Sequence, residues 1–145
     1  MVEAVILCVV TGLATLVMHE TGLLAIGGVA ARYGEESGRA ALLGIAVAIL
    51  SLHVTEIALY TGAIATDVLH LGRLVGDVDG SNLELLYFSA ETYTSLGFGD
   101  IIPMGQMRLI ASFEPLNGLI LLGWSASFLH LEVNRYWRRL ERPAR

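Results

Sequence analysis

The sequence predicts an all-α membrane protein with three transmembrane helices, a shorter re-entrant helix and a non-helical loop after it. Of its 145 residues, 54% are apolar and 16% are charged, and the mean hydropathy is +0.64. A soluble domain of ordinary composition carries about 25% charged residues. So short a chain cannot bury this much apolar surface in one core, because small domains keep a large surface. These observations exclude a soluble monomer and favour a protein surrounded by lipid.

The charge and cysteine content exclude several other classes. The formal net charge is −5, and a net acidic chain has no general attraction for nucleic acid, so no nucleic-acid partner is expected. The single cysteine, Cys8, excludes an internal disulfide framework. The apolar N-terminal run is not a signal peptide, because it begins with the acidic Glu3 and is too long.

Three apolar runs predict the transmembrane helices. They cover residues 2–31, 40–65 and 109–131, and few polar residues interrupt them. A hydrocarbon core about 30 Å thick requires roughly 20 mostly apolar helical residues, and each run supplies them. The lipid bilayer is therefore the expected partner of every long helix.

The arginines predict the orientation of these helices. Cytoplasmic segments of membrane proteins carry an excess of basic residues. The segment between residues 67 and 100 is acidic and is expected to face outward. We therefore expect a multi-pass protein of the plasma membrane with its N-terminus outside and its C-terminus in the cytoplasm. The seven arginines expected on the cytoplasmic side are Arg32, Arg39, Arg135, Arg138, Arg139, Arg142 and Arg145.

A short helix is predicted between the second and third runs. Residues 81–84, Ser-Asn-Leu-Glu, have the pattern of a capping box, in which two side chains satisfy free backbone donors at a helix start. The apolar spacing that follows predicts a helix of about three turns, too short to cross a bilayer. A loop with two glycines comes next. Non-helical backbone at membrane depth is tolerated only where it is buried in protein or lines a water-filled path.

The end of this short helix carries a recognisable motif. Residues 91–100 read ETYTSLGFGD, which resembles the selectivity filter of potassium channels, and the resemblance extends from residue 40 to about residue 136. In that family a threonine-rich turn is followed by Val or Ile, Gly, Tyr or Phe, Gly and Asp. This chain has Ser95 in place of the last threonine, Leu96 in place of valine or isoleucine, and Phe98 where tyrosine is commoner.

The resemblance implies a function and a division of the chain. It implies a channel that conducts potassium passively through a filter of backbone carbonyls. It also implies a homotetramer, because one loop cannot encircle an ion. A non-selective monovalent cation channel of the same fold is the alternative. Potassium ions in the filter are the only expected cofactor, with no organic cofactor and no enzymatic activity. The implied parts are an additional N-terminal helix with its turn (1–38), a pore domain (39–140) with outer helix (40–66), extracellular turret (67–81), pore helix (82–94), filter (95–99) and inner helix (106–137), and a short cytoplasmic tail (138–145).

The residue types of the motif suit the coordination of a dehydrated cation. Oxygen atoms must replace the hydration shell of the ion, whereas consecutive carbonyls of an ordinary strand point to opposite sides. Gly97 and Gly99 accept left-handed backbone angles without steric cost, which lets successive carbonyls point inward. The expected filter is Thr94, Ser95, Leu96, Gly97, Phe98 and Gly99, with potassium at the carbonyls of Ser95, Leu96, Gly97 and Phe98 and at the Ser95 hydroxyl.

The resemblance also assigns residues that support and gate the filter. Glu91 is expected behind the filter and paired with Asp100, and one of the two is expected to carry a proton, because two close carboxylates cannot both ionise cheaply. Tyr87 is expected as a third support. Gly118 is expected at the hinge of the inner helix and Gly123 at a second flexible point, although small residues also permit close helix packing.

Two histidine–glutamate pairs interrupt the first two helices. His19 with Glu20, and His53 with Glu56, lie at similar distances from the cytoplasmic ends, which predicts antiparallel helices with Glu20 or Glu56 facing a histidine across the interface. Both a buried structural clamp and a proton sensor fit this pattern. A small membrane redox protein, which binds haem or a metal through His19 and His53, is a remote alternative.

Two polar positions of the third run complete the sequence-based expectations. Glu114 is expected to contact the pore helix, because intramembrane charges face protein or water. A serine hydrolase that uses Ser125 and His130 is a second remote alternative. A nucleophile elbow requires a strained turn, whereas Ser125 lies inside an apolar helix and is expected to bond to its own helix backbone.

Overall fold

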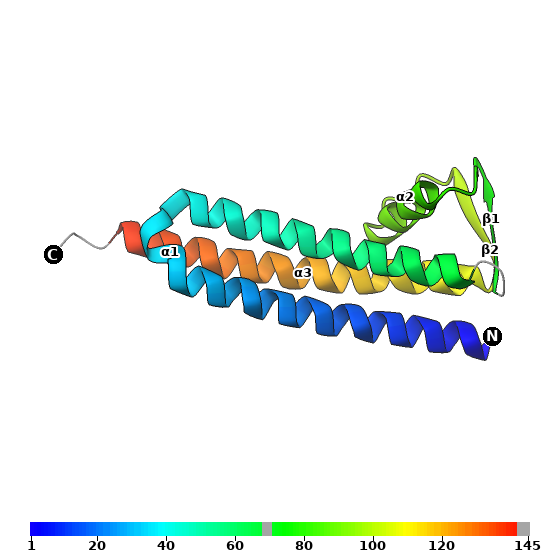
Figure 1. Cartoon of the computed structure of the whole chain (residues 1–145), viewed down its shortest axis with the longest axis horizontal. Coiled ribbons are helices and arrows are strands. Elements are labelled where there is room, and N and C mark those ends of the chain that lie inside the picture. Colours follow the sequence, from blue (N-terminus) through cyan, green and yellow to red (C-terminus); the bar gives the residue numbers. More distant parts are fainter. Residues whose placement is uncertain (68–70, 142–145) are drawn as a thin grey trace.

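The computed structural model describes residues 1–67 and 71–141. Three long helical segments lie side by side, with a shorter helix and two strands at one end (Figure 1). The N-terminus lies at the end with the strands, and the C-terminus lies at the opposite end. Residues 68–70 of the predicted turret, and Arg142 and Arg145 of the predicted tail, lie outside the described residues.

Helix α1 (Val2–Asp67) contains both of the first two predicted helices. Its direction reverses at Gly38, whose φ of 47° and ψ of −117° are not helical. Glycine lacks the Cβ atom that makes positive φ costly, so the reversal can occur at a single residue. The two halves contain the candidate membrane spans Val2–Arg32 and Gly38–Ala65. The expected turn is therefore a kink within one helical element.

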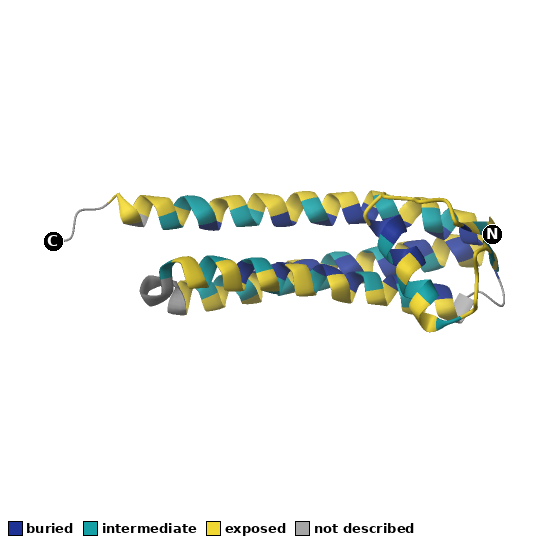
Figure 2. Cartoon of the chain, turned by 90° about the horizontal axis from the view of Figure 1, so that it is seen from above, coloured by how far each residue is buried: buried dark blue, intermediate teal, exposed yellow. Residues whose placement is uncertain are grey.

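Each half of α1 buries one stripe of residues, spaced three or four apart as a single helix face requires. The stripe of the N-terminal half is Ala4, Cys8, Thr11, Thr15, His19 and Leu23, and that of the C-terminal half is Ile45, Ile49, His53, Glu56, Tyr60 and Ile64. Buried residues lie mainly where the helices meet, and exposed residues cover the outside (Figure 2). Polar and ionisable residues thus occupy the middle of both stripes.

Helix α3 (Met107–Leu140) contains the third candidate span, Met107–Arg138. It begins one residue later than the predicted inner helix (106–137) and continues into the predicted tail. Only 28%, 22% and 28% of the most apolar windows of the three spans are buried within the chain. Such large exposed apolar faces require lipid or another subunit as partner. The fold class predicted from the sequence is confirmed, and the chain is a multi-pass membrane protein.

Two short strands were not expected from the sequence. Strands β1 (Gly72–Gly76) and β2 (Ile101–Gly105) pair antiparallel, with Gly72 opposite Gly105. A Cβ atom on Gly76 would lie 2.0 Å from the carbonyl oxygen of Asp100, so only glycine permits this approach. Strand β1 has only five residues, with a glycine at each end, and so lacks the alternating pattern that identifies a strand in a sequence. The pairing fixes the chain on the C-terminal side of the glycine-containing loop.

Helix α2 (Asn82–Tyr93) is the predicted short helix and ends one residue before the expected boundary at 94. The Ser81 hydroxyl caps it by accepting the Glu84 N–H at 3.2 Å. The reciprocal bond of the capping box is displaced, because the Glu84 carboxylate accepts the N–H of Gly80, at 2.7 Å, and of Asp79. Ser81 N–H binds Asp79 Oδ1 at 2.8 Å instead, and hydrogen bonds from Ser81 keep the pKa of Asp79 below its usual value.

Candidate functional site

The loop after α2, residues 94–100, is called the glycine loop. Its backbone alternates in hand, since Ser95, Gly97 and Gly99 have φ values of 60°, 53° and 81°, whereas Leu96 and Phe98 have negative φ. Alternation of left- and right-handed residues turns successive carbonyls to the same side of the chain. Ser95 is the one non-glycine residue with positive φ in the described part of the chain, a strained conformation of the kind that clusters at functional sites.

Glu91 of α2 holds the inner part of the glycine loop. Its backbone carbonyl accepts the N–H of Leu96 at 2.8 Å and that of Gly97 at 3.2 Å. Its buried carboxylate accepts the N–H of Phe98 at 2.9 Å through Oε2. One residue therefore satisfies three successive donors of the loop. With these N–H groups bonded on the side of α2, the loop carbonyls are free to face away from α2.

Tyr87 and Asp100 hold the outer end of the loop. The Tyr87 hydroxyl donates to Asp100 Oδ2 at 2.9 Å, which raises the pKa of Tyr87 to about 12. The Tyr87 ring lies parallel to that of Phe98, with 6.3 Å between centroids and 3° between planes. The carbonyl of Asp100 also accepts the N–H of Asp77 at 3.1 Å, next to β1.

These contacts correct the expected Glu91–Asp100 pair. In the described residues, Glu91 binds a backbone N–H of the loop, and Asp100 binds the Tyr87 hydroxyl and the N–H of Ile101. Each carboxylate thus has donors of its own, so a proton shared between the two is not required. The physical reason is that the Phe98 N–H lies within hydrogen-bond reach of the Glu91 carboxylate, and the Tyr87 hydroxyl within reach of Asp100.

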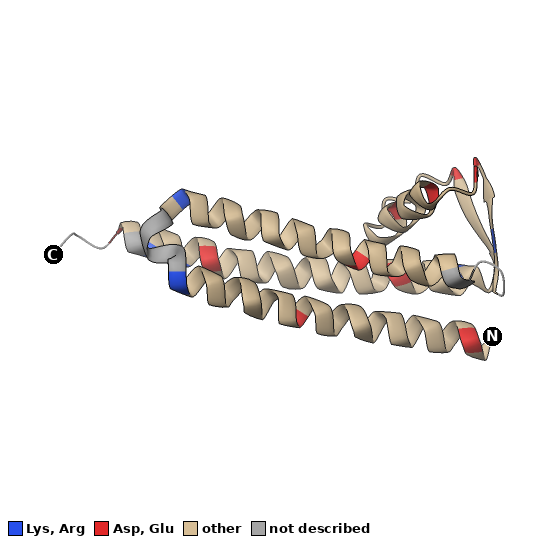
Figure 3. Cartoon of the chain, viewed as in Figure 1, with Lys and Arg blue, Asp and Glu red and all other residues tan. Residues whose placement is uncertain are grey.

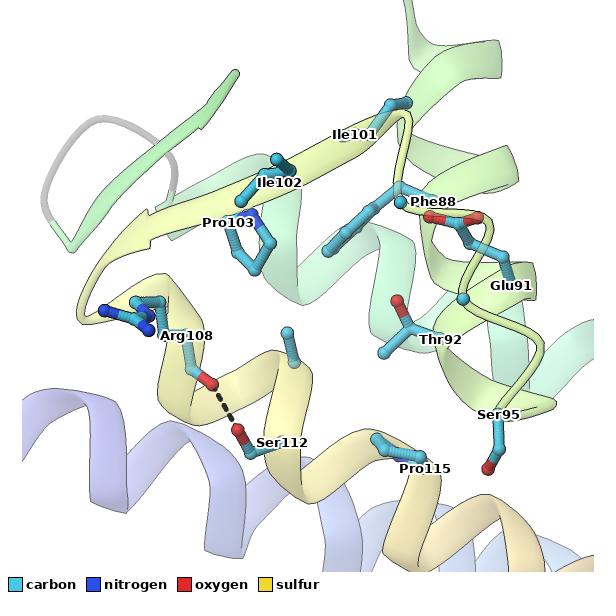
Figure 4. Close-up of a pocket in the computed structure, with 13 residues that line it drawn as sticks. Phe88, Glu91, Thr92, Ser95, Ile101, Ile102, Pro103, Arg108, Ser112 and Pro115 are labelled. Atoms are coloured by element: carbon cyan, nitrogen blue, oxygen red, sulfur yellow. Dashed lines mark hydrogen bonds between the residues drawn. The ribbon is translucent and has the colours of Figure 1, made fainter. Parts of the chain in front are cut away.

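A cavity of about 640 Å³ lies beside the glycine loop (Figure 4). Ser95, Gly97 and Gly99 line it from the loop, and residues of α2, β2 and α3 complete the wall. Leu96 and Phe98 are 60% and 65% exposed within the single chain. Apolar side chains next to an open cavity indicate that part of this wall belongs to another molecule.

Gly118 lets α3 approach the C-terminal end of α2. A Cβ atom on Gly118 would lie 2.2 Å from the Tyr93 carbonyl oxygen, whereas one on Gly123 would meet nothing within 4 Å. Close packing therefore accounts for Gly118, and a hinge role at either glycine stays a prediction. Above this contact, Glu114 accepts the Ser89 hydroxyl of α2 at 2.5 Å, the contact expected for this carboxylate.

Five polar residues from four helical segments meet in the interior, and we call them the buried polar cluster. They are His19, His53, Glu56, Tyr93 and Ser125, all buried. Glu56 accepts or shares hydrogens with His19 Nδ1 at 2.7 Å, His53 Nδ1 at 2.9 Å and the Tyr93 hydroxyl at 2.6 Å. Ser125 Oγ lies 3.0 Å from His53 Nε2 and 3.3 Å from His19 Nε2.

The comparisons with known proteins decide the family. A family model described as "Ion channel" matches residues 53–131, which is more than half of the chain. The chain belongs to this ion channel family. The comparisons with curated proteins and with solved structures found no match. In this ion channel, the matched segment contains the later part of α1, both strands, α2, the glycine loop and most of α3, and leaves the N-terminal half of α1 outside.

The structure selects one of the two histidine–glutamate arrangements predicted for this ion channel. The structure brings His19 and His53 together, with 5.3 Å between ring centroids, and selects Glu56 as the carboxylate between them. Glu20 is exposed and lies outside the buried polar cluster. On a helix, a residue next to a buried one points about 100° away, so His19 and Glu20 cannot share one face.

Sequence reasoning misses two members of the cluster. Ser125 binds both histidines rather than its own helix backbone, and His130 is exposed and binds Asn134 at 2.8 Å. The order Ser125–His53–Glu56 resembles that of a hydrolytic triad. However, Ser125 lies within α3, where helical bonds occupy the backbone N–H groups that an oxyanion hole would need. Tyr93 lies within the sequence motif of residues 91–100, and nothing in that motif indicates that its side chain contacts α1.

The geometry of the cluster also argues against the redox alternative. Two axial haem ligands present their ring nitrogens to one iron between them. Here the Ser125 hydroxyl occupies the position between the two Nε2 atoms. For a tetrahedral metal about 2.1 Å from each ligand, neighbouring ligand atoms lie about 3.4 Å apart. The nitrogen–oxygen distances of 2.7 and 2.9 Å are those of direct hydrogen bonds.

Proposed function

We propose that the chain forms a homotetrameric, potassium-selective channel in which the glycine loop is the filter. The observation that carries this proposal is the alternation in hand at Ser95, Gly97 and Gly99. This backbone supplies successive carbonyl oxygens on one side, which can replace the hydration shell of an ion. Ions then pass down their gradient, and no reaction is catalysed.

The expected ion sites follow from the loop geometry. Potassium binds at the carbonyls of Ser95, Leu96, Gly97 and Phe98 and at the Ser95 hydroxyl, with Thr94 and Gly99 at the two ends of the filter. The side chain of Leu96 does not ligand the ion, because the backbone carbonyl does. No organic cofactor is needed. The bonds from Glu91 and Tyr87 support this proposal, because they hold the loop from behind.

The exposed surface beside the loop supports a tetramer. One loop provides one wall of a filter, and closed cyclic symmetry is the common way to complete a ring. Leu96, Phe98 and the cavity of about 640 Å³ would face a neighbouring subunit. A copy seated there would remove apolar surface from water or lipid and would buttress the loop.

The distribution of charge supports an orientation. Basic side chains flank the reversal of α1, and acidic ones gather around α2 and the glycine loop at the other end (Figure 3). Arg32 and Arg39 are both exposed. By the positive-inside rule the reversal of α1 and the C-terminus lie in the cytoplasm, and the N-terminus, the strands and the outer mouth of the filter lie outside the plasma membrane.

Ion flux into liposomes tests the proposal. Purified protein is reconstituted, and potassium and sodium influx are measured with and without barium. Selective potassium influx that barium blocks is expected, and Gly97→Ala should abolish it, because alanine is strained at a φ of 53°. Gly44→Ala, in α1, where an added Cβ atom meets no neighbour within 4 Å, is the matched control. Equal sodium influx would favour the non-selective cation channel, and no influx of any ion would contradict the channel.

A further inference from the structure

The buried polar cluster joins the filter to the helices around it. His19 comes from the N-terminal half of α1, His53 and Glu56 from its C-terminal half, Tyr93 from the last turn of α2, and Ser125 from α3. Tyr93 directly precedes the glycine loop. Any change in the bonding of this cluster therefore acts on the residue from which the loop starts.

The cluster has one hydrogen too few when both histidines are neutral. Six contacts are short enough for hydrogen bonds: three from Glu56 to His19, His53 and Tyr93, two from Ser125 to the histidines, and one between His53 Nδ1 and the Tyr93 hydroxyl at 2.9 Å. The last joins two groups that also contact Glu56 Oε2, so it can share a hydrogen that either of them directs at Glu56. Each of the other five contacts requires one hydrogen between its heavy atoms. Two neutral imidazoles, one phenol and one hydroxyl supply only four, one from each group. One of the five contacts would then bring two lone pairs together.

One additional proton removes this conflict. With both nitrogens of His53 protonated, Nδ1 donates to Glu56 and Nε2 donates to Ser125, whose hydroxyl donates to His19 Nε2. The Nδ1 of His19 and the hydroxyl of Tyr93 both donate to Glu56. Each of these five contacts then holds one hydrogen, and the hydrogen on His53 Nδ1 also faces the Tyr93 oxygen at 2.9 Å. The imidazolium also balances the carboxylate, and an unbalanced charge inside a membrane is costly.

The surroundings of the cluster offer no other cation. On α1 a further titratable group, Tyr60, packs beside the cluster, and its ring lies 6.5 Å from that of Tyr93. From α3, Trp124 covers His19 at 5.6 Å, and the carboxylate of Glu114 lies behind Tyr93. Among the described residues, the ion pairs of the cluster involve its own histidines and no arginine.

We propose that His19, His53 and Glu56 bind one proton per subunit and that conduction requires this proton, an inference that rests on the channel function proposed above. Without the proton, one of the two histidines must give up a contact with Ser125 or with Glu56. Loss of a Ser125 contact weakens the attachment of α3 to α1, and loss of a Glu56 contact disturbs the bonds that hold Tyr93 at the start of the glycine loop. Ion flux should therefore fall as the pH rises.

Two substitutions test the hydrogen count directly. In Glu56→Gln the amide N–H donates to His53 and supplies the missing hydrogen, so the proton is no longer needed. In Ser125→Ala two contacts disappear, and the two histidines and Tyr93 then supply the three hydrogens that the three remaining Glu56 contacts require, with the His53–Tyr93 contact sharing one of them. Both variants should conduct better than the wild type at alkaline pH, and their potassium flux should no longer fall as the pH rises.

The experiment measures potassium influx into liposomes from about pH 5 to about pH 9, with equal pH on both sides. Wild-type influx should fall at least about tenfold across the range, roughly what one pH unit beyond a one-proton transition produces. The matched controls are Ser127→Ala, whose hydroxyl bonds only to its own helix, and His130→Gln on the exposed face. Both should keep the wild-type profile. A wild-type profile in Glu56→Gln and Ser125→Ala would overturn the inference.

A second measurement separates this inference from the channel function. Solid-state NMR of labelled histidine and glutamate in the reconstituted protein follows imidazolium and carboxyl protonation with pH. One group of the cluster should lose a proton over the range in which influx falls. Influx that is selective but independent of pH, with no protonation change, contradicts the proton site and leaves the channel intact. No influx at any pH contradicts the channel, and the NMR titration then decides the proton site alone.

Discussion

The glycine loop and the buried polar cluster both depend on a carboxylate that satisfies several donors, but they are built differently. Glu91 binds a backbone N–H only seven residues away, at Phe98. Glu56 binds side chains 37 residues away in both chain directions, at His19 and Tyr93, and Ser125 reaches His19 across 106 residues. The first site is assembled within one turn and loop, and the second exists only when four helical segments are packed.

The difference shows that one site determines the backbone shape of the loop, whereas the other holds the helices in position relative to one another. The loop obtains its shape locally, from left-handed residues and from the carboxylate behind it. The cluster supplies no shape of its own and instead fixes the position of α2 relative to α1 and α3. A substitution in the loop should therefore alter conduction in an assembled protein, whereas a substitution that breaks the close packing between helices should alter assembly itself.

The largest effect is expected where the two regions touch, at Gly118. In Gly118→Ala the new methyl group would lie only 2.2 Å from the Tyr93 carbonyl oxygen, which is a steric clash. Because both positions belong to helix backbone, neither can move aside to remove the clash. The cost should exceed about 3 kcal/mol, the upper end for ordinary overpacking, so the assembled protein should be lost. Detergent-resistant oligomer and thermal unfolding measure this loss. Gly123→Ala should behave as wild type, and equal damage from both would show that helix propensity, not contact, is responsible.

Loss of the Glu91 carboxylate should alter the loop without preventing assembly. Glu91→Ala leaves the Phe98 N–H without its acceptor, and a hydrogen bond to a charged group contributes about 1.5–3 kcal/mol. Potassium influx or selectivity over sodium should fall about tenfold or more, while the amount of oligomer is retained. Glu91→Gln keeps an oxygen acceptor and should lose much less. If Glu91→Ala instead removed the oligomer, the separation between the two regions would be wrong.

An intermediate effect is expected at Asn117, which binds the N-terminal half of α1. Its Nδ2 donates to the Thr15 hydroxyl at 2.5 Å and to the Tyr60 hydroxyl at 3.0 Å. Asn117→Leu should reduce the free energy of unfolding by about 1 kcal/mol, as for other interhelical bonds in membranes. Unfolding in graded denaturing detergent measures it. Asn134→Leu, which loses only a bond within α3, is the control and should change stability less.

The smallest effect is expected at Tyr87 on the exposed outer end of the loop. Tyr87→Phe removes one hydrogen bond to Asp100 and keeps the stacked ring. The folded-state pKa of about 12 lies above the usual value of 10, so this bond contributes fully below pH 10 and is lost as the pH rises through 12. Ultraviolet titration of the wild type should show one more tyrosine that ionises near pH 12 than Tyr87→Phe shows. An unchanged titration curve would refute the bond.

Much of the fold is readable from the sequence, because its signals are local. Apolar runs of spanning length identify the helices, and Ser81 marks the start of α2 one residue before it begins. The glycines of residues 94–100 identify the loop. The strand β1 is not readable, because five residues flanked by glycines acquire strand geometry only from β2, which follows the loop. The displaced capping bonds of Glu84 have the same origin in the turn before α2.

The sequence by itself determined the membrane environment, the three spanning helices and the presence of a filter-like loop, since each depends on hydropathy or on residues adjacent in the chain. Tertiary structure alone decided the partners. It selected Glu56 rather than Glu20, placed Ser125 between two histidines, and set Gly118 against Tyr93. The physical reason is that a helix face is fixed by its own periodicity, whereas the rotation and depth of one helix against another are decided only when all the faces pack together.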